Sequence, residues 1–285
     1  LDKELIFRII DEAAEIEEIK KIGFTGGEAT LRDKVLIEGI ERTKLRGMEA
    51  TLTSNGFWGK EPENARSWMK RLKAAGLDLL TLSLDEYHQK YIPLGSIRNI
   101  IRANEDTRIR ITLAVGDSLG EQDSAAILRE LGEDAYEHPL FLYPFMPVGR
   151  GKNLNKVSLK KVNENWSCHN QKMLSVLYNG NVYPCCSQAV YGSLLCEANI
   201  KDLSLKEIID KYQYFSLFSE LTHHNFGWLL SKAKEYQIPV NQESHSPCCF
   251  CHEIFTNKEF VERIRKDSMM DKISKILLTG KKQQP

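Results

Sequence analysis

The sequence predicts an α/β protein built from repeating strand–helix units. Two observations support this class: strand-like apolar segments recur about every 30 residues through roughly the first 147 residues, and an amphipathic helical pattern fills each interval. Strands and helices in alternation are typical of a parallel sheet covered by helices. Five strands preceded by a helix are compatible with an incomplete barrel or with a doubly wound sheet.

The individual elements follow from hydrophobic spacing. Residues 1–20 place Leu and Ile at helical intervals, with Asp and Glu between them, so the chain opens on a helix. Strand patterns follow around Ile22 and at 49–54, 77–84, 108–115 and 139–145. Helical patterns lie between them at 32–46, 62–75, 94–103 and 121–131, and Gly76 stands at a C-terminal cap position. Because a helix comes first, we expect that a first strand lies upstream of Leu1.

Composition disfavours several classes of partner. Lys+Arg and Asp+Glu both number 39, so bulk charge draws neither nucleic acid nor an anionic membrane. No apolar run approaches the roughly 18 to 20 residues of a membrane span, and no signal peptide is evident. We therefore expect a cytoplasmic protein. A 285-residue chain with 42% hydrophobic content suits one large domain, or a medium domain plus a smaller one.

Small and polar residues follow three consecutive strands of the predicted sheet. Gly26–Glu28 ends the first, Ser54–Gly56 the second and Ser83–Asp85 the third. The carboxyl ends of parallel strands form the edge where such folds bind ligands, and paired glycines let backbone approach a ligand closely. Each motif alone is an ordinary turn or helix start, but three together predict a binding site. His88, just beyond the third, is a weak candidate for contact with a substrate.

These motifs resemble the cofactor-contacting motifs of radical S-adenosylmethionine (SAM) enzymes, over about residues 1–150. The resemblance implies a partial (β/α)6 barrel of the TIM type, which these strands satisfy if one strand precedes Leu1. It implies that the ammonium of SAM lies at Gly26, Gly27 and Glu28, its ribose and carboxylate near Ser54, Asn55 and Ser83, and its adenine against backbone around Phe145 and Met146. A carboxylate suits an ammonium, and hydroxyls suit a ribose.

One element of the family pattern is absent from this sequence. Radical SAM enzymes carry a catalytic [4Fe-4S] cluster on a Cys-x3-Cys-x2-Cys loop after the first strand, and no Cys precedes Cys168. Either the sequence begins downstream of that loop, or the protein is a degenerate member without radical chemistry. We expect the former, because the missing segment is the one that would hold both the first strand and the cluster.

The second half contains all seven cysteines. Residues 176–186 predict a hairpin around an Asn-Gly turn, with Cys168 before it and Cys185 at its end. Cys248 and Cys251 form a Cys-x2-Cys pair farther along the chain. Four thiolates in two groups can bind zinc or an iron–sulfur cluster, and spacing alone leaves both open.

This region resembles the auxiliary-cluster domain called twitch, a shortened SPASM domain. The resemblance implies one auxiliary [4Fe-4S] cluster on Cys168, Cys185, Cys248 and Cys251. Cys186, Cys249 and Cys196 are then left over. Cys186 and Cys249 are buried thiols, alternative ligands, or weak candidates for donating a hydrogen atom to a substrate radical, as in radical SAM peptide epimerases.

The resemblance predicts a radical SAM enzyme that forms a 5'-deoxyadenosyl radical and modifies a ribosomally made peptide by epimerisation, crosslinking or oxidation. The alternatives are dehydrogenation of a small molecule and a catalytically inactive scaffold that binds metal or peptide. An electron donor such as flavodoxin or ferredoxin is the implied partner. We expect a barrel over 1–150, a twitch/SPASM-like domain over 151–257, and a C-terminal amphipathic helix and tail over 258–285. His223 and His224 are expected at the surface.

Overall fold

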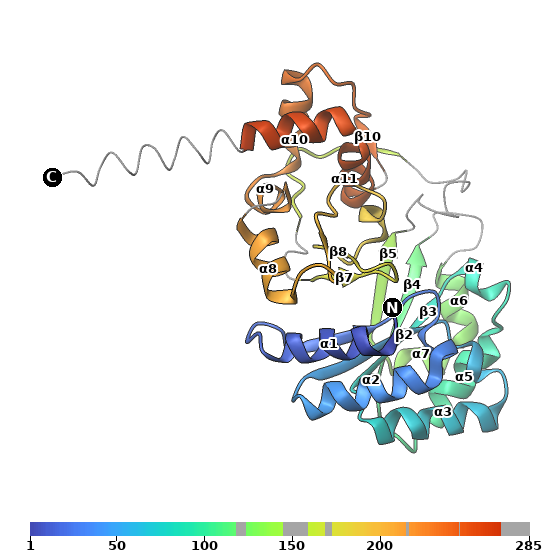
Figure 1. Cartoon of the computed structure of the whole chain (residues 1–285). Helices are drawn as coiled ribbons and strands as arrows, with labels where there is room; N and C mark the ends of the chain where they lie inside the picture. The colour runs from blue at the N-terminus through green and yellow to red at the C-terminus, as the bar shows by residue number, and fades with distance from the viewer. Residues whose placement is uncertain (118–123, 145–158, 169–172, 215–216, 245, 269–285) are drawn as a thin grey trace. The chain divides into compact units, whose positions relative to one another are not determined.

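The computed structural model describes residues 1–117, 124–144, 159–168, 173–214, 217–244 and 246–268 (Figure 1). The chain divides into two compact units: the described residues up to 144 belong to the first, and those from 159 onward to the second. Among these described helices, none is both long and apolar enough to cross a membrane.

The first unit contains a five-stranded parallel sheet. Its strands lie side by side in chain order: β1 (Lys21–Phe24), β2 (Glu49–Ser54), β3 (Leu79–Leu84), β4 (Arg110–Asp117) and β5 (Leu140–Pro144). The register pairs Ile22 with Ala50 and Leu80 with Ile111. Each predicted strand is present within two residues of its expected start, so the α/β class with a parallel sheet is confirmed.

Helices fill the intervals between the strands. They are α1 (Lys3–Ala14), α2 (Asp33–Leu45), α3 (Pro62–Ala75), α4 (Glu86–Gln89), α5 (Leu94–Ala103), α6 (Ser124–Leu131) and α7 (Glu133–Tyr136), with short 3-10 turns η1 (Ala29–Arg32) and η2 (Phe57–Gly59). Asp2 caps α1 by accepting a hydrogen bond from the Leu5 amide at 2.7 Å. Gly76 ends α3 with φ at 92°, as its predicted cap position requires.

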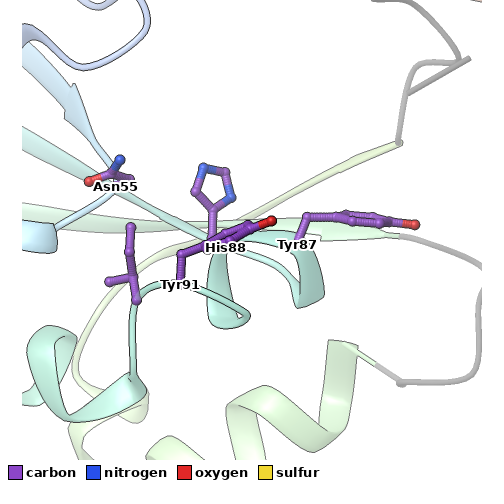
Figure 2. Close-up of a pocket in the computed structure, with 5 residues that line it drawn as sticks. Asn55, Tyr87, His88 and Tyr91 are labelled. Atoms are coloured by element: carbon purple, nitrogen blue, oxygen red, sulfur yellow. The ribbon is translucent and has the colours of Figure 1, made fainter. Parts of the chain in front are cut away.

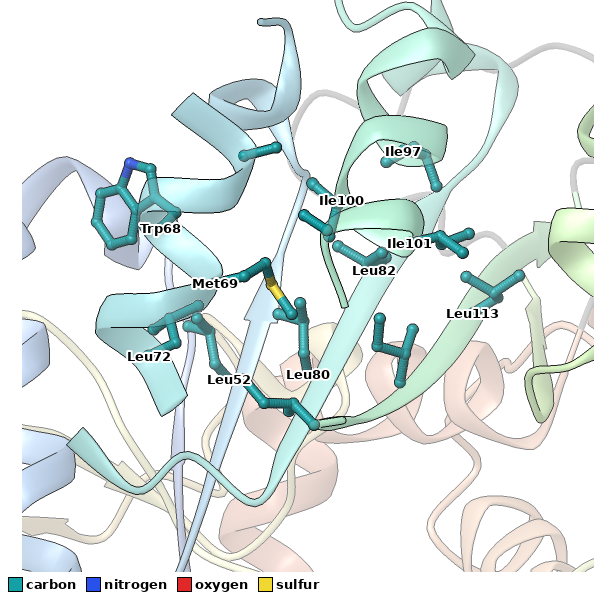
Figure 3. Packing of buried hydrophobic residues seen from close by; sticks show 14 of the residues in the cluster. Leu52, Trp68, Met69, Leu72, Leu80, Leu82, Ile97, Ile100, Ile101 and Leu113 are labelled. Carbon is teal, nitrogen blue, oxygen red and sulfur yellow. The ribbon is translucent and has the colours of Figure 1, made fainter. Parts of the chain in front are cut away.

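One face of this sheet is buried beneath helices α3 and α5. Figure 3 shows Met69 and Leu72 from α3 and Ile100 from α5 packed over the leucines of the strands. Along β3, the buried residues Leu80, Leu82 and Leu84 alternate with half-buried residues that point to the other face. The helix-covered face is therefore the core, and the polar strand ends lie at its carboxyl edge.

The second unit is built on small antiparallel sheets. β7 (Ser175–Val176), β8 (Asn181–Tyr183) and β9 (Ala198–Asn199) form one, and β6 (Lys160–Lys161) with β10 (Glu243–Ser244) forms the other. The predicted hairpin is the β7–β8 pair, and Gly180 occupies its turn with φ at 90°. A Cβ at Gly180 would lie 2.5 Å from Asn199 Oδ1, so this turn requires glycine.

Helices make up the rest of the second unit. These are η4 (Gln188–Val190), α8 (Leu205–Tyr214), α9 (Leu217–His223), α10 (Phe226–Glu235), α11 (Pro247–Thr256) and a helix over 258–268. In that last helix Phe260 is fully buried and packs against Phe255 and Tyr236. A helix over 258–268 thus buries one face in the second unit, while the rest of the expected C-terminal segment, 269–285, lies outside the described residues.

Candidate functional site

Glu28 connects several residues by hydrogen bonds at the carboxyl edge of the first unit's sheet. One of its carboxylate oxygens accepts hydrogen bonds from Thr30 Oγ1 at 2.7 Å and from Ser54 Oγ at 3.0 Å. The other accepts a hydrogen bond from the Asn55 amide at 2.8 Å. A single side chain therefore ties the loop after β1 to the end of β2, and the predicted residues Glu28, Ser54 and Asn55 come together.

Ser54 extends this network into the core. Its hydroxyl is buried and accepts hydrogen bonds from the Gly56 amide at 3.1 Å and from Trp58 Nε1 at 3.0 Å, while it donates to Glu28. Trp58 is 1% exposed. The position of the Glu28 carboxylate is thus set by a chain of bonds that ends in packed core, which is how a preorganised ligand group is held. The sequence did not predict this role of Trp58, because no sequence motif indicates that its indole N–H donates to Ser54.

The paired glycines before Glu28 leave open space. A Cβ built at Gly26 or at Gly27 meets no atom within 4 Å, and Gly26 adopts φ at 134°. Backbone without side chains can be approached closely by a ligand. Ser83, at the end of β3, is half-buried at the same edge of the sheet. Phe145 and Met146, the predicted adenine contacts, lie outside the described residues.

A second polar cluster stands at the end of β3. Asp85 is 1% exposed and caps α4 by accepting hydrogen bonds from the Tyr87 and His88 amides, both at 2.9 Å. Its other oxygen lies 2.5 Å from Nδ1 of His88 and accepts a hydrogen bond from the Tyr143 hydroxyl at 3.2 Å. The sequence placed Asp85 in a strand-end motif and offered His88 as a candidate but gave no sign of Tyr143, which reaches this site from β5.

Electrostatics favour a charged Asp85–His88 pair. Burial alone would raise the pKa of Asp85, but hydrogen bonds from the ring and backbone of His88 bring that pKa below its ordinary value. The pKa of His88 is raised, chiefly by the hydrogen bond with Asp85 and further by the nearby charge of Glu28. Burial and the charge of Asp85 raise the pKa of Tyr143, so its phenol stays protonated and donates.

Of these groups, His88 lines a cavity of about 260 Å³, together with Asn55, Tyr87, Tyr91 and Ile92 (Figure 2). The figure shows the imidazole of His88 standing between Asn55 and Tyr87. Aromatic walls with a few convergent polar groups are the usual composition of a small-molecule site. Two of the predicted residues, Asn55 after β2 and His88 after β3, thus line one cavity.

In the second unit, the four predicted metal ligands come from three segments. Cys168 precedes β7, Cys185 follows β8, and Cys248 and Cys251 lie on α11. Residues three apart share one face of a helix, so Cys248 and Cys251 point the same way. The chain runs from Cys185 into η4, which packs against α11.

The thiols influence one another through space. The pKa of Cys251 is raised by burial and by neighbouring Cys168 and Cys248. The pKa of Cys185 is raised by a hydrogen bond with Cys186, by burial, and by Cys186 and Cys168. Cys168 therefore lies near both Cys185 and Cys251. Among the described side chains, no three His, Cys, Asp or Glu converge as tightly as ligands of a single ion do. A four-iron cluster binds one thiolate at each iron, so its ligands stand farther apart than those of a single ion, and thiols are the donors that it takes.

The remaining cysteines have different surroundings. Cys249 accepts a hydrogen bond at 3.3 Å from the hydroxyl of Ser246, the residue that caps the N-terminus of α11. Cys186 is exposed beside Cys185. Cys196 lies 3.7 Å from the Ala198 carbonyl, to which its thiol donates. Among these three, Cys186 is the thiol that solvent or a ligand reaches most easily.

The other predicted histidines belong to the surface of the second unit. His223 ends α9 and is exposed. His224 is half-buried, stacks on Trp228 with ring centres 4.2 Å apart, and lies 3.7 Å from a Glu220 oxygen. His223 thus has the expected surface position, whereas His224 is partly covered by these contacts.

Two family models match this chain. A model described as the radical SAM superfamily matches residues 1–114, and SPASM, an iron–sulfur cluster-binding domain, matches residues 168–228. These matches support a radical SAM enzyme with a SPASM-like domain. Its cofactors are therefore SAM and a [4Fe-4S] cluster, with an auxiliary iron–sulfur cluster in the SPASM-like part.

This radical SAM protein is also similar to one curated protein along most of its length. The relative is "Putative peptide biosynthesis protein YydG" of Bacillus subtilis strain 168. The two sequences are 29% identical over 275 residues, which cover 91% of this chain and 84% of the relative. The similarity therefore extends through both units.

Proposed function

We propose that this enzyme modifies a peptide by radical chemistry that begins with the cleavage of SAM. The observation that carries the proposal is the Glu28 network at the carboxyl edge, because it presents a fixed carboxylate beside open glycine backbone in a radical SAM sheet. A peptide as substrate is suggested by the relative, whose name assigns it to peptide biosynthesis. The sheet order β1 to β5 is that of consecutive strands in a partial (β/α)6 barrel, which we infer as the complete fold.

The chain's own residues bind and orient the cofactor. Glu28 would accept hydrogen bonds from the methionyl ammonium, next to the backbone of Gly26 and Gly27. Ser54, Asn55 and Ser83 supply polar groups for its ribose and carboxylate, and backbone at Phe145 and Met146 would meet its adenine. When bound, SAM with the catalytic cluster supplies a 5'-deoxyadenosyl radical that abstracts a hydrogen atom from the substrate.

Cys168, Cys185, Cys248 and Cys251 would hold the auxiliary cluster. The assignment is supported by Cys168, which acts electrostatically on both the hairpin thiol of Cys185 and the α11 thiol of Cys251. The exposed thiol of Cys186 is our candidate for returning a hydrogen atom to a substrate radical. Cys249 is less suited, because it is half-buried and hydrogen-bonded to Ser246.

The test uses the reconstituted full-length enzyme with SAM and short peptides encoded by neighbouring genes as candidate substrates, in heavy water. Dithionite replaces the natural electron donor, which we infer to be a flavodoxin or ferredoxin. We expect 5'-deoxyadenosine together with a modified peptide, detected by mass spectrometry. Incorporation of one solvent deuterium without other change indicates epimerisation, and loss of two hydrogens indicates crosslinking or dehydrogenation. Peptide left unmodified while 5'-deoxyadenosine accumulates would exclude this substrate class.

A further inference from the structure

His88 presents one ring nitrogen to the cavity at the carboxyl edge. Nδ1 is engaged at 2.5 Å by Asp85, and within the described part of the chain no hydrogen bond reaches Nε2. The ring stands in the cavity between Asn55 and Tyr87 (Figure 2). Nε2 is therefore the ring atom that a bound molecule would meet.

Asp85 fixes both the orientation and the tautomer of that ring. Its carboxylate is held by two backbone amides and by the Tyr143 hydroxyl, so it cannot turn away from His88. Since a carboxylate only accepts hydrogen bonds, Nδ1 carries a proton. A second proton on Nε2 makes the ring a cation that donates into the cavity.

The charges near this cavity match those of an amino acid. Glu28 supplies a carboxylate at the edge of the sheet, and its charge acts directly on His88. A fixed anion and a fixed cation close together are complementary to the ammonium and carboxylate that share one carbon atom in the methionyl part of SAM. Asn55 links the two groups, because its amide is bound to Glu28 and its residue lines the cavity.

We propose that His88 binds the methionyl carboxylate of SAM through protonated Nε2 and so selects cofactors that carry this carboxylate. The inference rests on the proposed function, because it needs the Glu28 edge to be the SAM site. Asp85 is the positioning residue for His88, and Tyr143 holds Asp85 in place.

The test is a thermodynamic cycle with two ligands and two proteins. Calorimetry measures the dissociation constants of SAM and of decarboxylated SAM for the reconstituted enzyme and for His88→Gln. Loss of a charge-assisted hydrogen bond weakens SAM binding roughly 10- to 150-fold. Binding of decarboxylated SAM changes hardly at all, and it also reports that His88→Gln is folded. His223→Gln, an exposed position, controls for the substitution itself.

Each outcome decides between the inference and its competitors. Equal loss of both ligands in His88→Gln would mean that His88 only shapes the cavity. Unchanged SAM binding would place the carboxylate elsewhere and overturn the inference, while leaving the proposed function intact. Failure of the wild-type enzyme to bind SAM would instead contradict the proposed function.

The pH dependence of SAM affinity distinguishes a charged His88 that binds the carboxylate from a His88 that only shapes the cavity. The titratable groups that face or act on the His88 ring are Asp85, Glu28, Tyr87, Tyr91 and, through Asp85, Tyr143. The raised pKa of His88 predicts that SAM affinity falls as pH rises through that value, while His88→Lys retains affinity over the same range. A wild-type profile that is flat from pH 6 to 9 would contradict the assignment.

Discussion

The two candidate sites of this enzyme are held in opposite ways. At the carboxyl edge of the first unit, Glu28 and Asp85 have their charges met by hydrogen bonds from the protein itself. In the second unit, Cys185 and Cys251 crowd against other thiols, and both pKa values are raised. The first site is formed before its ligand arrives. The second gathers donors that repel one another once deprotonated, so it depends on the cluster to hold them.

The largest effect is expected from removing a cluster ligand. Cys168→Ala, or the same change at Cys185, Cys248 or Cys251, should abolish the auxiliary cluster, with loss of about four irons per chain. Because cluster binding stabilises the folded second unit, that unit should also unfold more readily. Iron assay and thermal unfolding under anaerobic conditions measure both effects.

Cys196→Ala is the matched control for this series, since Cys196 contacts the Ala198 carbonyl instead of the other thiols. It should leave iron content unchanged. Stoichiometric zinc in place of iron in the anaerobically purified protein would contradict the cluster assignment.

At the first site, Glu28→Gln tests the network without removing its shape. The change removes the charge that faces the SAM ammonium and places an amide donor opposite the Asn55 amide or Ser54 hydroxyl. A charge-assisted bond contributes about 1.5 to 3 kcal/mol, so SAM affinity should fall roughly 10- to 150-fold. Calorimetry measures the change.

Glu17→Gln provides the control at an exposed position just beyond α1. SAM affinity equal in all three proteins would mean that Glu28 only organises its own loop. The claim that the first unit holds a preformed SAM site would then fail.

Asp85→Asn should have a smaller effect, on stability. The pKa of Asp85 lies below 3.8 and that of His88 above 6.5, so the charged pair contributes fully between those values. Its contribution is lost as pH falls through the Asp85 pKa and as pH rises through the His88 pKa. Near pH 5.5 the substitution should cost about 1 to 1.5 kcal/mol, the difference between a charged and a neutral hydrogen bond.

Urea unfolding of wild type and Asp85→Asn at pH 5.5 and 9 measures this pair. The stability difference should be larger at pH 5.5. A difference that is independent of pH would show that Asp85 acts only as the cap of α4.

The smallest effect is expected at the paired glycines. Gly26→Ala places a side chain at φ of 134° without any clash, so backbone strain alone should cost about 1 kcal/mol. Gly27→Ala also meets no neighbour within 4 Å and should change stability little. Thermal unfolding of the two variants compares them, and equal melting temperatures would contradict the strain argument.

Local patterns in the sequence were sufficient to predict the strands and the longer helices of the first unit, but not the short helices α4 and α7. Gly76 and the apolar alternation of 79–84 are examples, because a cap or a buried face is encoded within a few residues. The contact between Asp85 and Tyr143 was not predictable, since it joins β3 to β5 across the intervening β4. The register explains how it forms: Tyr143 pairs with Gly116, which carries no side chain to block the reach.

The second unit shows the same limit. Spacing singled out Cys248 and Cys251 as a Cys-x2-Cys pair, and both lie on α11, three residues apart. The packing of η4 against α11, which brings the hairpin cysteine toward that helix, depends on tertiary contacts between segments nearly 60 residues apart. No local pattern encodes such a contact.

The central claim is that the first site is preformed whereas the second needs its cluster. Hydrogen exchange on residues 1–285, with and without reconstituted iron and sulfide, tests it directly, because all seven cysteines lie from Cys168 onward. We predict that the amides of Asn55 and Gly56, bonded to Glu28 and Ser54, keep the same protection in both states. The amides of Ser187 and Cys249 should become protected only with iron. Equal protection of Ser187 and Cys249 in both states, or a comparable change at Asn55 and Gly56, would contradict the claim.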